Sequence, residues 1–518
     1  MDRRPWLHLG IGFALVTGVL QAQGPDQWYR DGRAAVERAK QLTPITGKAK
    51  NVILFLGDGM GVTTVTAARI LEGQRRGQSG EENLLFFETL PYTALIKTYS
   101  TNEQVPDSAG TMTAIVTGVK TKSGVLSVNE NVTVGDYASA KGNEVTTILE
   151  LAERAGLSTG VVSTTRITHA TPAACYAHTP DRDWESDART PKEALDHGFG
   201  DIARQLVEFN AGNGLEVALG GGRDAFLPGE SPRPGLGRKD GRDLTAAWLE
   251  KPNSRYVTNR EQLNAVDPAT TGHLLGLFSP DHMAYECDRG GDKTDEPSLT
   301  EMTVKAIELL SKNPKGFFLM IEGGRIDHGH HAGNAHRALM DTIEFAGAVR
   351  AAAEKIDRKE TLVIVTADHS HVLTMGGYPT RGNPILGKVV QNDKRGNPEK
   401  PPAKDKLGLP FTTLGYANGP GYTGASAEQK EGSKKTPHYG RRYQGIASGR
   451  PDLSEVDTTE AGYMQEATVP LSSETHGGED VPVYADGPQA HLFHGVLEQN
   501  VIFHVMVEAL GLKGAEAP

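Results

Sequence analysis

Five short apolar runs rich in β-branched residues are spaced along the chain, and each ends in a glycine-rich or polar turn. They cover residues 51–56, 159–163, 216–219, 317–321 and 361–365. Continuous apolar runs that alternate with helical patterns are typical of parallel strands buried on both faces. The sequence therefore predicts an α/β fold, a three-layer sandwich whose mostly parallel central sheet is covered by helices on both faces.

The composition excludes several classes of protein. The chain has 518 residues and a formal net charge of −11, which argues against a nucleic-acid-binding protein because such a protein needs a basic face. A hydrophobic content of 37% is enough for a core and excludes global disorder. The two cysteines, Cys175 and Cys287, exclude a disulfide scaffold or a cysteine-rich zinc module. Whether they pair is left open.

The N-terminus has the pattern of a secretory signal. Arg3 and Arg4 precede an apolar stretch at residues 7–20, and a small-residue cleavage site ends at Ala22. The stretch is too short to span a bilayer, and the alternative is a short buried helix. We expect a signal peptide at 1–22, a catalytic domain at 23–518 and an exported, periplasmic or secreted protein. Because residues 507–518 form no hydrophobic tail, we expect no membrane span and no glycolipid anchor.

Two stretches interrupt the alternation of strands and helices. Residues 391–406 and 424–436 are rich in Lys, Pro, Gly and Ser and poor in large apolar side chains. We interpret residues 380–472 as a loop-rich, inserted subdomain whose function the composition does not reveal, and we find no convincing internal repeat. Residues 26–42 have the pattern of an amphipathic surface helix.

Histidines gather in two short windows, each of which begins at a predicted strand end. Six of the seventeen lie in residues 322–336 and 368–371: His328, His330, His331, His336, His369 and His371. Glu322, Asp327 and Asp368 lie in the same windows. Mixed carboxylates and imidazoles suit a borderline divalent ion such as zinc, and two windows suggest more than one metal. Polar loops exposed to solvent are the alternative for either window alone.

Two isolated residues are further ligand candidates. Asp58 follows the first predicted strand on a Gly-Asp-Gly turn, where the backbone leaves a carboxylate unobstructed, although the same motif is common in ordinary turns. His476 lies in a polar segment at residues 472–478 and is, by default, a surface histidine.

Ser108 is the candidate nucleophile. It follows Pro106 and precedes small residues that can begin a helix, and a helix N-terminus favours a developing alkoxide or a bound phosphate. An ordinary N-cap serine is the alternative. Because no Gly-x-Ser-x-Gly motif surrounds Ser108, we expect a metal, not a histidine, to activate it.

Taken together, these motifs resemble the alkaline phosphatases, specifically their animal-like branch in an exported, bacterial form. The resemblance covers about residues 26–507 and is weakest in the insert. Its motifs are Asp58, Asp107-Ser108, Glu322 with Asp327 and His331, Asp368-His369, and residues 474–476. Residues 165–172, 176–179 and 487–492 indicate the animal-like branch.

The resemblance implies a phosphomonoester hydrolase that forms a phosphoserine at Ser108 and uses two zinc ions and one magnesium ion. It implies that Asp327, His331 and His476 hold one zinc, that Asp58, Asp368 and His369 hold the other, and that Asp58, Thr171 and Glu322 hold magnesium. It also implies that Arg182 grips two phosphate oxygens, while His169 and His328 lie around the magnesium and the phosphate. A homodimer, in which residues 26–42 embrace the partner, is implied as well. We do not predict calcium, because Ser279 replaces an acidic ligand of the animal enzymes.

Three other functions compete with this interpretation. A sulfatase needs a Cys/Ser-x-Pro-x-Arg context, which Ser108 lacks. A phosphodiesterase of the same superfamily often uses Thr as its nucleophile and omits the third metal, so Glu322 and Thr171 favour a monoesterase. A non-catalytic metal- or phosphate-binding protein would not need the complete set of nucleophile, ligands and arginine.

Overall fold

The first strand, β1 (Asn51–Gly57), shows why the apolar runs become central strands. All its residues except Asn51 are buried, and it pairs in parallel with β7 on one side and β8 on the other. A strand flanked by neighbours and covered on both faces has no solvent side, so alternation of polar and apolar residues is lost. The computed structural model describes residues 25–229, 231, 237–290 and 295–513; the predicted signal peptide lies outside these residues.

Ten of the described strands form the main sheet, in the order β15-β2-β14-β8-β1-β7-β3-β4-β6-β5. Within it β14 is antiparallel to both of its neighbours, whereas all the other pairings are parallel. Besides β1 the strands are β2 (Tyr92–Lys97), β3 (Ser158–Arg166), β4 (Val217–Gly221), β5 (Ser254–Val257), β6 (His273–Leu277), β7 (Phe317–Gly323), β8 (Thr361–Thr366), β14 (Val481–Asp486) and β15 (Val496–Glu498). The predicted mostly parallel sheet is confirmed.

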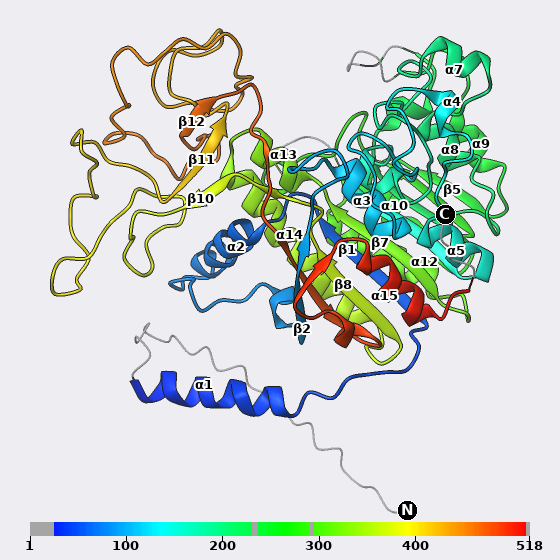
Figure 1. Cartoon of the computed structure of the whole chain (residues 1–518), viewed down its shortest axis with the longest axis horizontal. Helices are drawn as coiled ribbons and strands as arrows, with labels where there is room; N and C mark the ends of the chain where they lie inside the picture. The colour runs from blue at the N-terminus through cyan, green and yellow to red at the C-terminus, as the bar shows by residue number, and fades with distance from the viewer. Residues whose placement is uncertain (1–24, 230, 232–236, 291–294, 514–518) are drawn as a thin grey trace, which may run out of the picture. The chain divides into compact units, whose positions relative to one another are not determined.

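Two groups of helices cover the sheet (Figure 1). One group comprises α2 (Val62–Arg75), α12 (Leu299–Leu310), α13 (Arg325–His331) and α14 (Ala335–Lys355). The other comprises α3 (Ser108–Thr117), α5 (Ile148–Ala155), α6 (Ala170–Ala173) and α15 (Val501–Leu510). Helices within each group contact one another, and α12 and α14 of the first group and α5, α6 and α15 of the second contact the sheet, which gives the predicted three-layer architecture.

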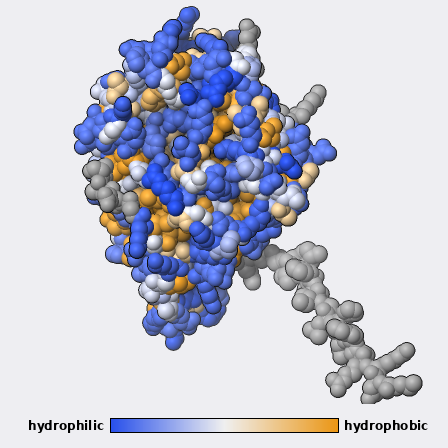
Figure 2. All heavy atoms as spheres, turned by 90° about the vertical axis from the view of Figure 1, so that its right-hand side faces the viewer, coloured by the Kyte–Doolittle hydropathy of each residue, from blue (hydrophilic) through white to orange (hydrophobic). Residues whose placement is uncertain are grey.

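Shorter helices connect these elements. They are α4 (Tyr137–Ala140), α7 (Lys192–Asp196), α8 (Ile202–Val207), α9 (Leu244–Leu249), α10 (Arg260–Ala265), α11 (Glu286–Arg289) and the 3-10 helices η1 (Phe86–Thr89), η2 (Arg223–Phe226) and η3 (Ala490–Leu492). Figure 2 shows the face that lies on the right in Figure 1; it is largely hydrophilic, with scattered hydrophobic patches.

A small sheet joins β10 (Leu373–Met375), which precedes the predicted insert, to β11 (Leu414–Gly419) and β12 (Ala467–Pro470), which lie within it. Long loops connect these strands, as the low apolar content suggests, and they project from the sheet at the upper left of Figure 1. A separate two-stranded pairing joins β9 (Ser370–His371) to β13 (His476–Gly477). The bounds 380–472 stay a prediction.

Residues 1–43 and 44–518 separate into two units by their internal contacts. In the first, α1 (Pro25–Lys40) is the amphipathic helix expected near residues 26–42, and none of its residues is buried. Both cysteines are free thiols, with Cys175 buried and Cys287 partly exposed. Among the described helices, none combines the length and the apolar character that crossing a bilayer requires.

Phe345 of α14 fixes this helix against the sheet. Its ring meets that of Phe55 in β1 edge-to-face at a centroid distance of 5.9 Å, and that of Phe87 at 6.1 Å. All three side chains are fully buried. Aromatic pairs at such distances stabilise a core beyond the area that they bury.

We expect Phe345→Ala to lower the free energy of unfolding by about 3–5 kcal/mol, because it leaves a cavity between the helix and the sheet. Urea unfolding followed by circular dichroism measures the change. Val134→Ala, at a half-exposed side chain, is the control and should change stability by less than about 0.5 kcal/mol. Equal losses in the two variants would contradict this account of the core.

Candidate active site

Four neighbouring parallel strands, β8, β1, β7 and β3, deliver acidic and histidine side chains to one edge of the sheet. Asp58 directly follows β1, Glu322 lies next to the end of β7, and Asp368 follows β8. His169 follows β3 and is the N-cap of α6. Because the carboxyl ends of parallel strands meet at one edge, residues far apart in the sequence converge there.

The remaining ligand candidates come from α13 and β13. Asp327 and His331 are four residues apart on α13 and therefore lie on one face of the helix. His476 comes from β13, whose antiparallel pairing places it opposite His371 of β9. The pairing explains how a segment that is remote in sequence joins the site.

Asp327, His331 and His476 form the first donor group. Asp327 Oδ1 lies 3.2 Å from His331 Nε2 and 3.4 Å from His476 Nε2, and the two Nε2 atoms are 3.2 Å apart. Four ligands at zinc–nitrogen distances of about 2.0–2.1 Å in a tetrahedron are separated by about 3.3 Å. The three donor atoms therefore have the spacing of a tetrahedral zinc site.

Hydrogen bonds at the far side of each ring fix the tautomers of this group. His331 Nδ1 is 2.6 Å from the Glu474 carbonyl, and His476 Nδ1 is 2.7 Å from the Pro106 carbonyl. A carbonyl only accepts, so each Nδ1 carries the hydrogen and each Nε2 presents its lone pair. Two lone pairs and a carboxylate oxygen face one another, an arrangement that a cation stabilises.

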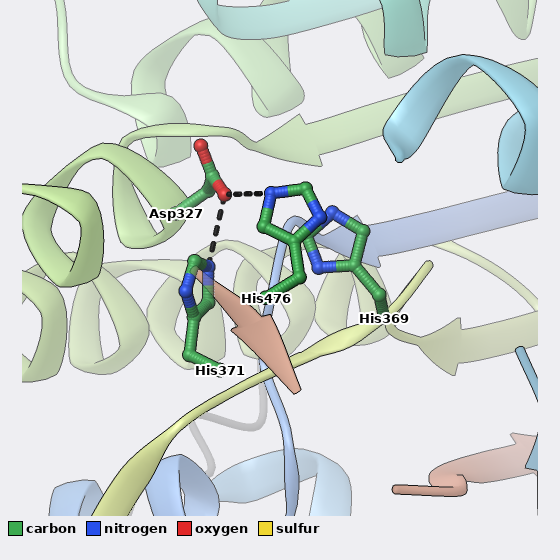
Figure 3. Close-up of side chains that lie close together, drawn as sticks. All are labelled: Asp327, His369, His371 and His476. Carbon is green, nitrogen blue, oxygen red and sulfur yellow. Dashed lines mark hydrogen bonds and ion pairs between the residues drawn. The ribbon is translucent and has the colours of Figure 1, made fainter. Parts of the chain in front are cut away.

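His371 has a different role, which our sequence interpretation did not assign. Its Nε2 lies 2.9 Å from Asp327 Oδ1 (Figure 3). Its Nδ1 lies 2.6 Å from Glu474 Oε2. Burial would lower the pKa of His371, but the carboxylates of Glu474 and Asp327 raise it to about 10. A protonated His371 donates to both carboxylates and orients Asp327, so it does not act as a ligand.

Asp58, Asp368 and His369 form the second donor group, and Ser108 joins it. His369 Nε2 lies 3.3 Å from Asp58 Oδ1 and 3.4 Å from Asp368 Oδ2. Ser108 Oγ lies 3.1 Å from His369 Nε2 and 3.4 Å from Asp58 Oδ1. Asp368 Oδ2 is buried and lacks a hydrogen bond within the described chain, as expected of an oxygen that takes a cation. The rings of His369 and His476 stack at 3.6 Å, so the two groups are adjacent.

Ser108 is the first residue of α3 and does not cap it. The N-cap is Asp107, whose side chain accepts a hydrogen bond from the Gly110 N–H. This arrangement leaves the Ser108 hydroxyl free to face the second donor group, and Ser108 is almost fully buried. The structure therefore disfavours the alternative of an ordinary capping serine.

The third donor group contains Asp58, Thr171 and Glu322. Thr171 Oγ1 and Glu322 Oε1 are buried and have no hydrogen-bond partner among the described residues. The other carboxylate oxygen of Glu322 accepts from Ser163 and, at 3.2 Å, from Thr165. Buried polar oxygens are nearly always paired, so two orphaned oxygens point to a hard cation such as magnesium.

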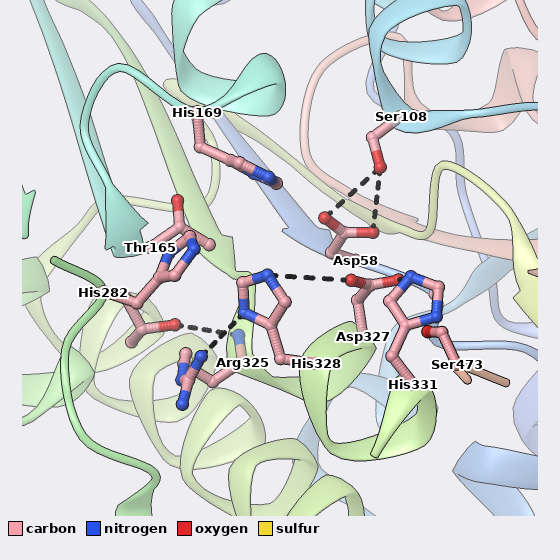
Figure 4. A network of polar contacts seen from close by, with 12 residues as sticks. Asp58, Ser108, Thr165, His169, His282, Arg325, Asp327, His328, His331 and Ser473 are labelled. Atoms are coloured by element: carbon pink, nitrogen blue, oxygen red, sulfur yellow. Dashed lines mark hydrogen bonds and ion pairs between the residues drawn. The ribbon is translucent and has the colours of Figure 1, made fainter. Parts of the chain in front are cut away.

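Arg182 lies beside Ser108's helix and is held by Asp107. Its guanidinium is 3.1 Å from Asp107 Oδ2 and 3.1 Å from His169 Nε2. His328 is held by Arg325 at 2.9 Å, and its ring is 4.2 Å from that of His282 (Figure 4). Our sequence interpretation missed His282, which no motif marks, and gave Asp107 no role.

Burial and like charge dominate the electrostatics of the site. Burial, together with the charges of Asp368, Asp327 and Glu322, raises the pKa of Asp58 well above its usual range. Burial raises the pKa of Glu322 to about 7. Burial alone would also raise the pKa of Asp327, but the neighbouring imidazoles lower it well below its usual range. Such a concentration of buried acids is unfavourable unless cations or protons neutralise it.

Gly59 is required at its position because His371 lies directly against it. Its φ is +67°, and a β-carbon there would lie 2.2 Å from His371 Nε2. Its N–H donates to Asp368 Oδ1 at 3.0 Å. A larger residue would displace His371 or distort the turn that presents Asp58.

Proteins of one known family are similar to this chain over most of its length. The family model described as alkaline phosphatase matches residues 49–512. The tissue-nonspecific alkaline phosphatase isozyme of Gallus gallus is 47% identical over 94% of this chain and 89% of its own length. The Homo sapiens isozyme is 45% identical over 98% of this chain and 92% of its own length. The crystal structure of Thermus thermophilus alkaline phosphatase is 27% identical, with a TM-score of 0.63 over 92% of this chain and 94% of that one.

We expect Glu322 to make the metal-free protein progressively less stable, relative to a Glu322→Gln variant, as the pH rises from about 5 to 8. The pKa of Glu322 is raised from 4.5 to about 7, so its protonated form contributes stability that is full below pH 4.5 and is lost as the pH passes about 7. Urea unfolding of chelator-treated protein at several pH values measures this. Glu322→Gln does not titrate, so its stability relative to that of the native protein should rise over this pH range, whereas an identical pH dependence in the two proteins would contradict the prediction.

Proposed function

Because the chain belongs to the alkaline phosphatase family and is a phosphomonoesterase, we propose that it cleaves phosphate monoesters through a phosphoserine at Ser108. One observation carries this proposal. Ser108 Oγ lies 3.1–3.4 Å from His369 Nε2 and Asp58 Oδ1, where it occupies a corner of the second donor group. A hydroxyl in that position can meet both a cation and a phosphorus atom.

The family implies metal cofactors, and the three donor groups fit them. We assign zinc to the first group (Asp327, His331, His476) and to the second (Asp58, Asp368, His369), because imidazole and carboxylate suit zinc. We assign magnesium to the third (Asp58, Thr171, Glu322), whose donors are all oxygens. When bound, these cations lower the pKa of hydroxyl and water ligands and neutralise the charge of the phosphate.

The reaction then proceeds in two displacements at phosphorus. Ser108 Oγ forms a bond to phosphorus while the bond to the leaving oxygen breaks, and the alcohol departs. A water oxygen next replaces Ser108 Oγ, which releases inorganic phosphate and restores the serine. The proton lost by the serine in the first step balances the one gained by the leaving alkoxide.

Arg182 grips the phosphate in this proposal. A guanidinium offers two parallel N–H groups that match two phosphate oxygens, and Asp107 holds the side chain at the mouth of the site. His169 and His328 lie around the phosphate and the third donor group, where they orient oxygen atoms. Their pKa values are lowered well below the usual range, by burial and next by Arg182 and Arg325, so both act as neutral hydrogen-bond partners.

We also propose a homodimer and an exported location. The N-terminal helix α1 has no buried residue and exposes Trp28 and Tyr29, which supports an additional contact for this helix in a dimer. The apolar stretch at residues 7–20 after two arginines supports export.

The decisive experiment compares the hydrolysis of an aryl phosphate monoester with that of the matching diester at mildly alkaline pH, with zinc and magnesium supplied. We expect a strong preference for the monoester, which a chelator abolishes. A preference for the diester would contradict the assignment of Glu322 and Thr171 to a monoesterase site. Tight zinc binding without turnover of either substrate would favour the binding-protein alternative.

We expect Ser108→Ala to reduce kcat/KM for the monoester by at least about 10³-fold, because the covalent route is lost. Steady-state kinetics measure the effect. The native protein should carry covalently bound phosphate when the reaction is stopped at low pH, and the Ser108→Ala variant should carry none. Ser311→Ala, at an exposed serine that ends α12, is the matched control. Trapping of phosphate by the Ala variant would overturn the assignment of the nucleophile.

A further inference from the structure

Positive charge is concentrated in one part of an otherwise acidic chain. Residues 388–450 contain twelve Lys and Arg but five Asp and Glu, a net charge of +7, so the rest of the chain carries −18. These residues form the loops on either side of β11, and we call them the basic lobe. In Figure 1 they extend away from the main sheet at the upper left. Such separation of charge creates a strong local field that attracts anions.

Two hairpins of the same design build the first half of the basic lobe. The sequence Asp-Lys-x-Gly-x-Pro occurs at residues 393–398 and again at 405–410. In each, the Asp backbone pairs with the residue four positions later, at 2.8 Å in both hairpins. Gly396 and Gly408 have φ of +82° and +80°, a conformation that favours glycine. This short repeat escaped our sequence interpretation.

The acidic side chains of the basic lobe are used to hold its loops. Asp393 Oδ1 accepts from the N–H groups of Arg395 and Asn397, and Asp405 Oδ1 accepts from those of Leu407 and Leu409. Glu428 pairs with Arg441, and Glu431 accepts from the N–H and hydroxyl of Ser448. Four of the five carboxylates therefore have internal partners, and most of the basic side chains do not.

The unpaired basic side chains point to solvent. Seven are exposed and form no ion pair within the described residues: Lys394, Arg395, Lys400, Lys404, Lys406, Lys430 and Arg442. Lys394 and Lys406 occupy the same position in the two hairpins. Neighbouring like charges repel one another, and a polyanion relieves that repulsion while its counterions are released.

We propose that the basic lobe is a docking surface for a flexible acidic polysaccharide. The exposed cations lie on several loops that project from the small sheet in different directions, so a flexible chain contacts more of them than a flat bilayer does (Figure 1). Single-stranded nucleic acid needs aromatic platforms for its bases, and within the lobe Tyr439 is the exposed large aromatic side chain. A carboxylated sugar polymer needs neither a plane nor stacking.

Docking at the basic lobe leaves the catalytic residues untouched. The seven unpaired basic residues lie outside the three donor groups, Arg182 and Ser108. Turnover of a small aryl phosphate is therefore a test of folding that is independent of docking. The proposed docking is tested by binding alone, and it does not depend on the assignment of Ser108 as the nucleophile.

The test compares two variants that remove the same charge from different places. The lobe variant carries Lys394→Gln, Lys400→Gln, Lys404→Gln and Lys406→Gln. The control variant carries Lys50→Gln, Lys141→Gln, Lys315→Gln and Lys359→Gln, all exposed and outside the basic lobe. Fluorescence anisotropy of labelled polygalacturonate, with neutral dextran as a second probe, gives Kd at several salt concentrations.

We expect polygalacturonate to bind the native protein and dextran not to bind. The lobe variant should raise Kd by about tenfold or more. It should also reduce the slope of the logarithm of the binding constant against the logarithm of the salt concentration by roughly three to four, because each lost contact leaves counterions on the polysaccharide. The control variant should change Kd by less than about twofold, and both variants should keep the native rate on the aryl phosphate.

Four outcomes would overturn the proposal. The first is an equal loss of affinity in both variants, and the second is no binding of polygalacturonate at low salt. The third is tighter binding to poly-dT or to vesicles containing phosphatidylglycerol than to the polysaccharide. The last is an assembly larger than the proposed dimer that light scattering detects at low salt but not at high salt, and that the lobe variant does not form, because a second copy of the chain would then occupy the lobe in place of the polymer.

Discussion

Repulsion between buried acidic groups is the constraint around which the site is organised. The parallel packing of β8, β1 and β7 brings Asp368, Asp58 and Glu322 together, and all three are fully buried. Burial of a single ionised carboxylate without a partner already costs roughly several kcal/mol, and burial of three neighbouring ones is far less favourable. The sheet that creates the site therefore depends on protons or cations to remain stable around it.

The histidines help to neutralise this negative charge in two different ways. His331 and His476 give their Nδ1 hydrogens to backbone carbonyls and turn bare lone pairs toward Asp327, which prepares them for a metal. His371 lies between two carboxylates and holds a proton, so it supplies positive charge without a metal. The same residue type thus serves as ligand in one place and as counter-charge in another, and hydrogen-bond partners decide which.

Much of this could be predicted from the sequence, because buried parallel strands have a recognisable composition and their ends mark the site. Asp58, Glu322 and Asp368 follow such runs directly, and Asp327 and His331 have helical spacing. No local sequence pattern marks His476 as a ligand, and only the resemblance to a family linked it to Asp327 and His331. The bridging role of His371 depends on where Glu474 lies, which is a tertiary fact. The twin turns at 393–398 and 405–410 escaped notice because they are too short to register as a repeat and become evident only through their hydrogen bonds.

The pairing of β13 with β9 also makes the first donor group depend on two distant parts of the chain. Asp327 and His331 leave the ribosome on one helix, but the third donor, His476, is synthesised 145 residues after His331 and is placed by that short pairing. A nascent chain that ends before residue 476 has the first two donors and cannot complete the group. An intact first donor group therefore requires that β13 has paired with β9, so it reports that the chain on both sides of the inserted loops has come together.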